Sequence, residues 1–404
     1  MSPDRPFEAG LRRGAPSGPP PTESEPALLE QVRAEIAATG PLTFARFMAI
    51  ALYDPEHGYY RTAAERPGRS GDFLTAPDIH PIFGAAIARQ VDEVWQRLGR
   101  PADFVLREYG PGSGTLAATI LAGLRSDGSE LAGTLRYQPI EINENRRREL
   151  LERLGAVARV PDLQAPATFG GVVLANEFLD ALPVHRLVQQ GGRLQELFVA
   201  WDAARGGPLE QPGELSAIAL AERLERDEVR LAEGQLIEVC LAVEPWLAEV
   251  AAGLQRGLVL VIDYGHQAPA LYDPARTGGT LRAYAGHRAH ADPFIAIGRQ
   301  DLTAHVDLTA LEAEARRRGF DVLGDVSQAE LLVGCGLEEL LDRVRSNPAT
   351  TMEDWLAVRS AVARLLDPAA LGGFRAVLLG RGLDPELPLR GLSAASPAGD
   401  RLPD

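Results

Sequence analysis

The chain has 404 residues, 45% of them hydrophobic and 24% charged, which is enough for one large α/β domain with additions or for two smaller domains. Its 56 acidic residues outnumber its 41 basic residues, all of them arginines, and the net charge of −15 argues against a nucleic-acid partner, because binding to phosphates needs clustered positive charge. A cationic substrate suits an acidic chain better. No apolar run approaches the roughly 18 residues of a membrane span, so we expect no membrane insertion.

The N-terminal part of the chain is predicted to be a tail followed by helices. Residues 1–26 are rich in proline, glycine, serine and charge and lack the apolar stretch of a signal peptide, so we expect a disordered tail and a cytoplasmic protein. Residues 27–100 are predicted to form a helical region. Two helices are separated by Gly40-Pro41, with Thr43 as N-cap of the second, and a third helix is predicted from Pro81 to Leu98.

Strands and helices alternate over residues 101–383, which predicts the α/β fold class with a mostly parallel sheet. The predicted strands are Phe104–Tyr109, Leu135–Glu141, Ala156–Val160, Gly171–Ala175, Leu258–Asp263, Phe320–Val326 and Phe374–Leu379. The predicted helices are Thr115–Arg125, a charged helix ending at Leu154, Glu214–Glu225 and Val243–Leu254.

Two additions to this core are expected. A β-hairpin of Val184–Val188 and Leu194–Trp201, turning at Gly191-Gly192, marks an insertion over about residues 184–240. A substrate-side segment is expected over about residues 266–310, and a second disordered tail over residues 384–404.

A glycine-rich turn stands between the first predicted strand and its helix. Gly110, Gly112 and Gly114 let a ligand approach the backbone closely, next to the free N–H groups of a helix N-terminus. Glu141 ends the next strand, where a carboxylate can accept hydrogen bonds from both ribose hydroxyls. These features predict binding of S-adenosylmethionine (SAM).

A dinucleotide-binding turn is the competing interpretation, because it shares the strand, turn, helix and carboxylate. Its G-x-G-x-x-G pattern would require glycine at position 115, where Thr115 stands. Glu108, just before the turn, also favours SAM because a carboxylate can meet a cationic donor.

Five sequence blocks resemble the MidA-like family of methyltransferases, and their order and spacing extend over about Leu42 to Leu379. The blocks are Tyr53-Asp54-Pro55 with Gly58-Tyr59-Tyr60, Gly71-Asp72-Phe73-Leu74-Thr75-Ala76-Pro77, Glu108-Tyr109-Gly110-Pro111-Gly112-Ser113-Gly114-Thr115, Asn176-Glu177-Phe178-Leu179-Asp180-Ala181-Leu182-Pro183, and Ile262-Asp263-Tyr264-Gly265 with Asp301-Leu302-Thr303-Ala304-His305-Val306-Asp307.

The resemblance implies a class I SAM-dependent methyltransferase: a Rossmann-like sheet with an N-terminal helical region and an inserted hairpin and substrate-side subdomain. It implies SAM as cofactor, with Thr75 among its ligands, and protein arginine as acceptor. Mitochondrial members of this family are arginine methyltransferases required for assembly of respiratory complex I. Symmetric dimethylarginine, with a complex I subunit as one candidate substrate, is therefore what the resemblance implies.

Three polar residues follow the buried strand Gly171–Ala175, at the sheet edge where ligands bind in open α/β folds. We predict that Glu177 and Asp180 hold the cationic acceptor, because carboxylates bind a guanidinium in bidentate geometry, and that Asn176 lines the donor side. The structural alternative is that Glu177 and Asp180 cap a helix beginning at Phe178.

Asp263 and His305 are further catalytic candidates. Asp263 ends a core strand, with Tyr264 as a possible wall of the acceptor channel, and a strand-end aspartate bonding to loop amides is the alternative. His305 could orient the acceptor or relay a proton, or form structural hydrogen bonds. His287, His290 and Asp292 lack a fourth ligand, so no metal is expected.

Three alternative functions stay open at this point. The chain could methylate a small molecule or another side chain, bind SAM as an assembly factor without turnover, or be a nicotinamide oxidoreductase. The sequence indicates no particular oligomeric state.

Overall fold

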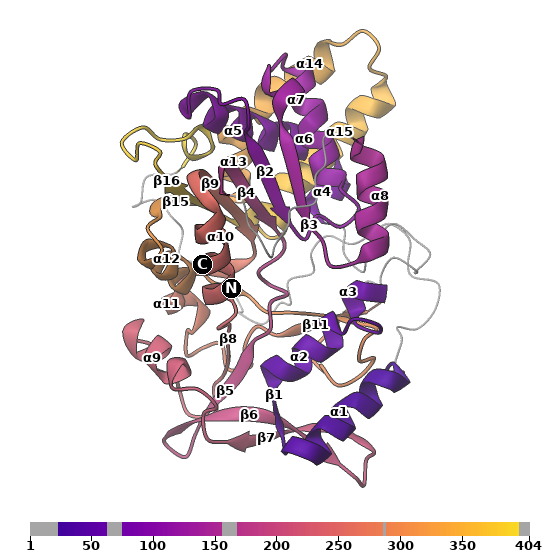
Figure 1. Ribbon diagram of the computed structural model, residues 1–404, viewed down its shortest axis with the longest axis vertical. Helices are drawn as coiled ribbons and strands as arrows, with labels where there is room; N and C mark the ends of the chain where they lie inside the picture. Colours follow the sequence, from indigo (N-terminus) through magenta and orange to yellow (C-terminus); the bar gives the residue numbers. More distant parts are fainter. Residues whose placement is uncertain (1–22, 63–74, 156–167, 286–287, 396–404) are drawn as a thin grey trace.

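The computed structural model describes residues 23–62, 75–155, 168–285 and 288–395. Within these ranges the chain forms two lobes, an upper one built on a mostly parallel sheet and a lower one built on antiparallel strands (Figure 1). The predicted strand Ala156–Val160, residues 71–74 of the second sequence block and His287 lie outside the described residues. No helix among the described residues is long and apolar enough to cross a membrane.

The upper lobe is organised by a six-stranded sheet of order β15-β16-β9-β4-β2-β3. The strands are β2 (Val105–Tyr109), β3 (Arg136–Ile140), β4 (Phe169–Asn176), β9 (Leu254–Asp263), β15 (Asp321–Ser327) and β16 (Arg375–Arg381). β2, β3, β4 and β9 are parallel, whereas β16 is antiparallel to both of its neighbours. Each corresponds to a predicted strand, so the α/β prediction is confirmed.

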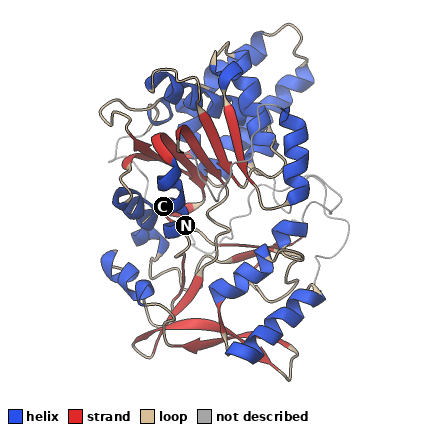
Figure 2. Ribbon diagram, viewed as in Figure 1, coloured by secondary structure: helices blue, strands red, loops and turns tan. Residues whose placement is uncertain are grey.

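Helices cover both faces of this sheet (Figure 2). β4 explains why, because Val172 and Leu174 enter one apolar cluster while Val173 and Ala175 enter the other. The first cluster packs against α5 (Ile82–Arg97), α6 (Thr115–Ser126), α8 (Glu144–Leu154), α13 (Gln328–Gly334), α14 (Leu337–Ser346) and α15 (Met352–Leu366), with the short α4 (Ala76–Ile79) and α7 (Leu131–Thr134). The second packs against α10 (Val243–Gly253) and α12 (Leu308–Arg317).

The lower lobe joins the N-terminal helices to the insertion. Its five-stranded sheet contains β1 (Leu42–Thr43), β5 (His185–Gln190), β6 (Arg193–Asp202), β7 (Gly207–Gly213) and β8 (Leu236–Val239). β5 and β6 are the predicted hairpin, and β1 pairs with β6 through Leu42 and Val199. The two segments therefore share one sheet.

Helices and small sheets complete the lower lobe. The helices are α1 (Pro26–Thr39), α2 (Phe44–Tyr53), α3 (Tyr59–Thr62), α9 (Ile218–Arg226) and α11 (Ala268–Leu271). As predicted, Thr43 caps α2, accepting a hydrogen bond from the Arg46 N–H at 3.1 Å. Residues 265–307 add a β12-β11-β13 sheet of Arg288–His290, Arg282–Ala285 and Asp301–Thr303, and the β10-β14 pair of Gly265–His266 and Val306–Asp307.

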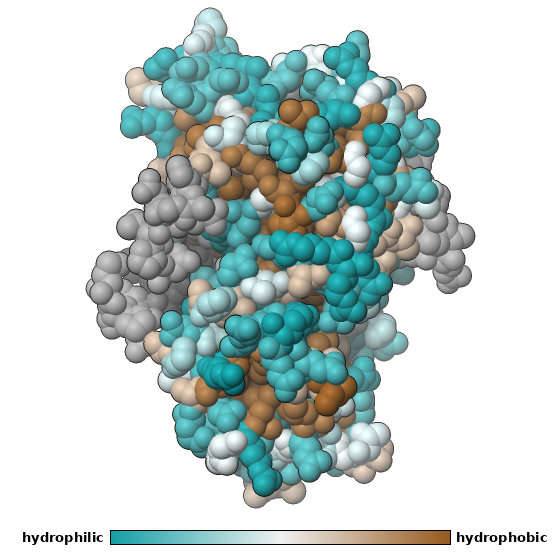
Figure 3. Space-filling view, turned by 90° about the vertical axis from the view of Figure 1, so that its left-hand side faces the viewer, coloured by the Kyte–Doolittle hydropathy of each residue, from teal (hydrophilic) through white to brown (hydrophobic). Residues whose placement is uncertain are grey.

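The two lobes have separate apolar cores. The lower lobe buries one cluster around Phe44 and Phe47 and another around Leu187 and Leu220, distinct from the clusters on the upper sheet. On the face shown in Figure 3, hydrophobic residues likewise gather in two areas, one on each lobe, with a largely hydrophilic band between them.

The bounds predicted for the two disordered tails, residues 1–26 and 384–404, include residues that belong to the folded structure. At the N-terminal side, the Glu25 N–H donates to the Ile297 carbonyl at 2.8 Å and Pro26 begins α1. At the C-terminal side, residues 384–395 are packed rather than disordered, because Leu389 is buried and the Gly391 N–H donates to Gln90 Oε1 at 2.9 Å.

The predicted helix Glu214–Glu225 begins four residues later, at Ile218. Residues 214–217 instead form a loop between α9 and the edge strand β7, a strand that the sequence analysis missed and that contains Pro208 and Pro212. The Ser216 N–H then donates to buried Glu196 at 2.6 Å, which keeps that residue out of the helix.

Candidate active site

The glycine turn follows β2 and leads into α6, as predicted. Gly112 has a φ of 55°, in the left-handed region that glycine adopts without strain. A Cβ added at this position would have Arg146 Nη1, at 4.0 Å, as its nearest neighbour. The other two glycines are needed for packing, since a Cβ on Gly110 would lie 3.1 Å from Phe178 and one on Gly114 3.0 Å from Leu150. Gly112 is therefore the open position of the turn.

Glu141 follows β3 and contacts this turn. Its Oε2 accepts from the Gly112 N–H at 3.0 Å, and its Oε1 accepts from the Asn143 N–H at 2.8 Å. Burial raises the pKa of Glu141, while these backbone N–H groups oppose the rise. The carboxylate thus ties the glycine turn to the loop before α8, a structural role that the sequence analysis did not foresee.

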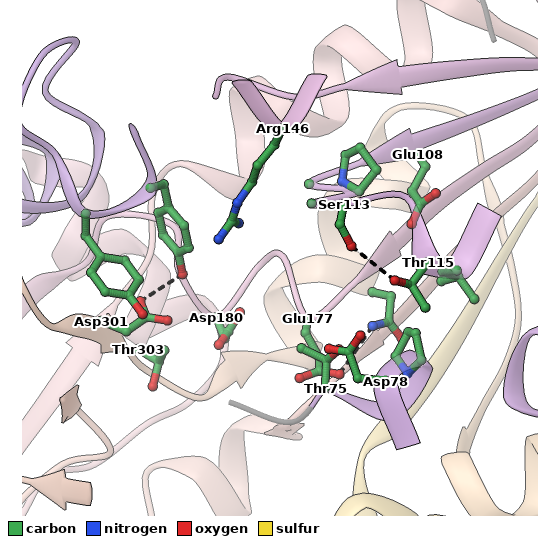
Figure 4. A pocket seen from close by; sticks show the side chains of 18 of the residues that line it. Thr75, Asp78, Glu108, Ser113, Thr115, Arg146, Glu177, Asp180, Asp301 and Thr303 are labelled. Atoms are coloured by element: carbon green, nitrogen blue, oxygen red, sulfur yellow. Dashed lines mark hydrogen bonds between the residues drawn. The ribbon is translucent and has the colours of Figure 1, made fainter. Parts of the chain in front are cut away.

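An open cavity lies where the strands β2 and β4 end (Figure 4). It is lined by Tyr59, Tyr60, Thr75, Pro77, Asp78, Glu108, Gly110, Pro111, Gly112, Ser113, Thr115, Leu116, Arg146, Asn176, Glu177, Asp180, Tyr264, Asp301 and Thr303. This list contains seven of the predicted site residues: Thr75, Glu108, Gly110, Gly112, Asn176, Glu177 and Asp180. The other four, Gly114, Glu141, Asp263 and His305, do not line it.

The end of the cavity at the glycine turn carries polar groups suited to a cationic, amine-bearing ligand. Glu108 is 3% exposed and accepts from the Tyr137 hydroxyl at 2.6 Å, and burial raises its pKa to about 7. Asn176 Oδ1 is buried, and within the described residues it has no hydrogen-bond partner. A buried acceptor without a donor costs free energy, so a ligand N–H or O–H there would be stabilising. These groups fit the ammonium and sulfonium charges of SAM.

Glu177 lies between this end and a second, acidic end of the cavity (Figure 4). Its φ of 49° is unusual for a residue other than glycine, and its N–H is held by the Ile262 carbonyl at 2.8 Å. Its Oε1 accepts from the Ala76 N–H at 3.0 Å. Burial raises the pKa of Glu177 to about 7, and the nearby charge of Asp180 adds to the effect. The strained backbone and the anchored carboxylate both indicate a functional side chain.

Asp180 belongs to the acidic end. Its side chain is 6% exposed, its Oδ2 accepts a hydrogen bond from the Tyr264 hydroxyl, and its Oδ1 is buried with no partner among the described residues. Burial raises the pKa of Asp180 to about 6, and the Tyr264 hydroxyl opposes this. Residues 177–183 form turns rather than a helix, so the capping alternative is wrong for both Glu177 and Asp180.

Asp263 has the structural role that the sequence analysis left as the alternative. The side chain is fully buried, and its Oδ2 accepts from the N–H groups of Phe178 at 3.1 Å and Leu179 at 2.9 Å. Its Oδ1 accepts from the Tyr264 N–H at 2.9 Å. Asp263 thus holds the loop that carries Glu177 and Asp180, and its predicted contact with the acceptor is not supported.

His305 lies behind the cavity wall rather than in the cavity. Its ring packs edge-on against Tyr264, with 5.3 Å between ring centroids, and also contacts His266. Burial lowers the pKa of His305 to about 3, so the imidazole is neutral at physiological pH. This placement does not support a proton relay to the acceptor, because Tyr264 lies between them.

Two residues at the acidic end were missed. Asp301 begins β13 and Tyr60 lies in α3, and the Tyr60 hydroxyl donates to Asp301 Oδ1 at 2.8 Å. Both occur in sequence blocks that carry the family resemblance. Their presence in these blocks could have identified them as site residues. They were missed because neither follows the end of a predicted strand, which was the criterion used for the other acids.

The glycine turn, the acid after the next strand and the reversed strand β16 define a class I SAM-dependent methyltransferase. A family model described as S-adenosyl-L-methionine-dependent methyltransferase matches residues 86–326. The chain belongs to this family, and specifically to its MidA-like branch, in which the curated relatives are named NDUFAF7. SAM is therefore its methyl donor.

Three relatives support this assignment. The chain is 31% identical to the Mus musculus mitochondrial protein arginine methyltransferase NDUFAF7, with 80% of this chain and 77% of that protein covered. It is 29% identical to the Drosophila melanogaster homolog, with 89% and 88% covered. A COG1565 superfamily member from Burkholderia thailandensis, solved bound to S-adenosyl-homocysteine, has 33% identity and a TM-score of 0.81, with 91% and 94% covered.

Proposed function

We propose that the chain transfers methyl groups to arginine side chains of a protein. The observation that carries this proposal is the charge of the cavity. Five carboxylates line it, and Arg146 is the one cation among its described lining residues. A partly buried site of this charge favours a cationic acceptor. The relatives named protein arginine methyltransferases support the same conclusion.

For the donor we propose the end of the cavity at the glycine turn. Gly110 and Gly112 would admit SAM against the backbone, Thr75 and Asn176 would offer it polar contacts, and Glu108 would face its positive charge. Glu141 would accept hydrogen bonds from the ribose hydroxyls in addition to the one from the Gly112 N–H. Gly114 would support the turn by packing closely against Leu150. When bound, SAM supplies the methyl group, and the electron pair of the broken carbon–sulfur bond returns to sulfur as the carbon–nitrogen bond forms.

For the acceptor we propose that Glu177 and Asp180 hold the guanidinium. A guanidinium has a pKa above about 12, so it enters as a cation, and carboxylates can orient it with one nitrogen directed at the methyl group. Orientation supplies much of the catalysis of such an in-line displacement. The same carboxylates stabilise the methylated cation until the nitrogen releases its proton to solvent.

The test uses a lysate of host cells that lack this protein, incubated with purified full-length chain and methyl-labelled SAM. After acid hydrolysis of the protein fraction, the label should be found in methylated arginine. The Gly112→Val protein, which should not bind SAM, is the matched control. Label in another amino acid or only in small molecules would contradict the proposal.

The identity of the acceptor protein and the cellular location of this chain are predictions. The family resemblance makes a respiratory complex I subunit one candidate, and mass spectrometry of the labelled proteins identifies the substrate directly. The mouse and fly relatives are named mitochondrial, whereas the sequence of this chain predicts a cytoplasmic location.

A further inference from the structure

Two aspartates from distant segments meet at the acidic end of the cavity. Asp180 lies in the loop after β4, whereas Asp301 begins β13, and Figure 4 shows both at the same end, beside Thr303. The backbone joins the two segments there, because the Ala304 N–H donates to the Asp180 carbonyl at 2.9 Å. The relative position of the two carboxylates is thus built into the fold.

Each aspartate is oriented by a tyrosine hydroxyl, Asp180 by Tyr264 and Asp301 by Tyr60. A tyrosine hydroxyl is a neutral donor, so its hydrogen bond orients a carboxylate without adding a positive charge. Tyr60 is itself held by stacking on Tyr53, with ring centroids 5.5 Å apart and planes 25° apart.

The stacked pair of Tyr53 and Tyr60 contacts both segments, because Tyr60 bonds Asp301 and Tyr53 bonds the residue after Asp180. The Tyr53 hydroxyl donates at 2.7 Å to the carbonyl of Ala181, the residue after Asp180. Burial raises the pKa values of Tyr53 and Tyr60, and the charges of both Asp301 and Asp180 raise them further. Both aspartates therefore act on the same buried aromatic pair.

Asp180 also has unused bonding capacity directed at this space. Its side chain is more than nine-tenths buried and lines the cavity, and its Oδ1 has no hydrogen-bond partner within the described residues. A buried carboxylate oxygen without a donor is costly unless a ligand supplies one. Arg146, the one cation among the described lining residues, comes from α8 and approaches Gly112.

We propose that Asp301 joins Asp180 and Glu177 in the subsite that binds the guanidinium of the acceptor, with Tyr60 and Tyr264 as positioning residues, an inference that rests on the proposed function. A planar guanidinium has five N–H donors in a fixed arrangement and can bond more than one carboxylate while one nitrogen stays directed at the donor. An ammonium is a compact point charge on a flexible stem. The paired aspartates therefore select arginine over lysine.

The direct test is binding, measured without turnover. Nα-acetyl-arginine amide and Nα-acetyl-lysine amide are titrated calorimetrically into the full chain saturated with S-adenosyl-homocysteine. The wild-type protein should prefer the arginine compound, and Asp180→Asn and Asp301→Asn should each weaken its binding by roughly ten- to a hundredfold, the scale of a hydrogen bond to a charged group. Equal binding of the two compounds, or unchanged affinity in both variants, overturns the proposal.

Two controls separate the subsite from general effects of folding and charge. Asp321→Asn removes the same charge from an exposed position on β15 and should change nothing. Tyr60→Phe keeps every charge but removes the hydroxyl that donates to Asp301, so it should raise the KM for an arginine peptide several-fold with little change in kcat. S-adenosyl-homocysteine affinity should stay constant in all four variants, whereas a misfolded protein would lose it.

Methyl transfer to a pool of arginine peptides separates this inference from the proposed function. If the wild-type protein methylates arginine and the aspartate variants do so with unchanged KM, the subsite is wrong and the function stands. If the protein binds the arginine compound selectively but methylates no arginine peptide or protein, the subsite stands and the function is wrong.

Discussion

Replacing Glu177 with glutamine separates the charge of this side chain from its shape. The amide keeps a carbonyl oxygen for the Ala76 N–H, which donates to Glu177 Oε1 at 3.0 Å, but it cannot ionise. We expect the folded variant to bind SAM with nearly unchanged affinity and to lose methyl transfer. A charge-assisted bidentate contact is worth about 2–4 kcal/mol, so kcat and kcat/KM should fall together by roughly thirty- to a thousandfold.

Relative to the wild-type protein, the same variant should become more stable as the pH rises. Burial raises the folded-state pKa of Glu177 from 4.5 to about 7, so this carboxyl favours folding below pH 4.5, and that contribution is lost as the pH rises through about 7. Glutamine does not titrate. The difference in unfolding free energy, variant minus wild type, should therefore rise by up to about 3 kcal/mol from pH 4.5 to pH 8.

The assay is urea unfolding of the SAM-free proteins at several pH values, together with single-turnover transfer at pH 8. Glu222→Gln, at an exposed position on α9, is the matched control and should show neither effect. A stability difference that does not vary with pH would mean that Glu177 ionises normally in the folded protein. Unimpaired transfer by the folded variant would refute its role at the acceptor and leave Asp180 and Asp301 to hold the guanidinium.

Three further changes test the donor site and the loop that supports the acceptor site. Gly112→Val should abolish SAM binding in calorimetry while thermal unfolding stays cooperative, because a branched side chain would enter the open side of the turn and disfavour its φ of 55°; normal affinity would remove the turn from the site. Glu141→Ala should weaken SAM binding by roughly 1.5–3 kcal/mol, and unchanged affinity would mean that another group holds the ribose. Asp263→Ala should lower the unfolding free energy by about 2 kcal/mol or more, since it leaves the buried N–H groups of the 178–180 loop without their acceptor, and an equally stable variant would contradict this role.

The class of protein was predictable from local sequence patterns. A glycine turn between a strand and a helix, a buried strand at Gly171–Ala175 and a hairpin at Gly191-Gly192 depend on short-range backbone preferences, and the structure has all three. Strand ends that meet at one edge of a parallel sheet also predicted that Glu177 and Asp180 would share a cavity with the glycine turn.

The orientation of side chains at the strand ends depended on tertiary structure. Asp180 and Asp263 were both catalytic candidates in the sequence, yet Asp263 is turned under the 178–180 loop whereas Asp180 faces the cavity. The difference arises because Asp263 accepts backbone N–H groups of a loop from another strand, more than 80 positions earlier in the chain. A local pattern carries no information about such a partner.

The same reason applies to the pairing of Tyr60 with Asp301. These residues are 241 positions apart and meet only because α2, β1 and the inserted hairpin fold into one lobe, which brings α3 to β13. The sequence by itself determined the sheet, the donor-binding turn and the acidic character of the chain. Only the long-range packing, including that of the lower lobe, decided which acidic side chains face the cavity and which hold the loops that line it.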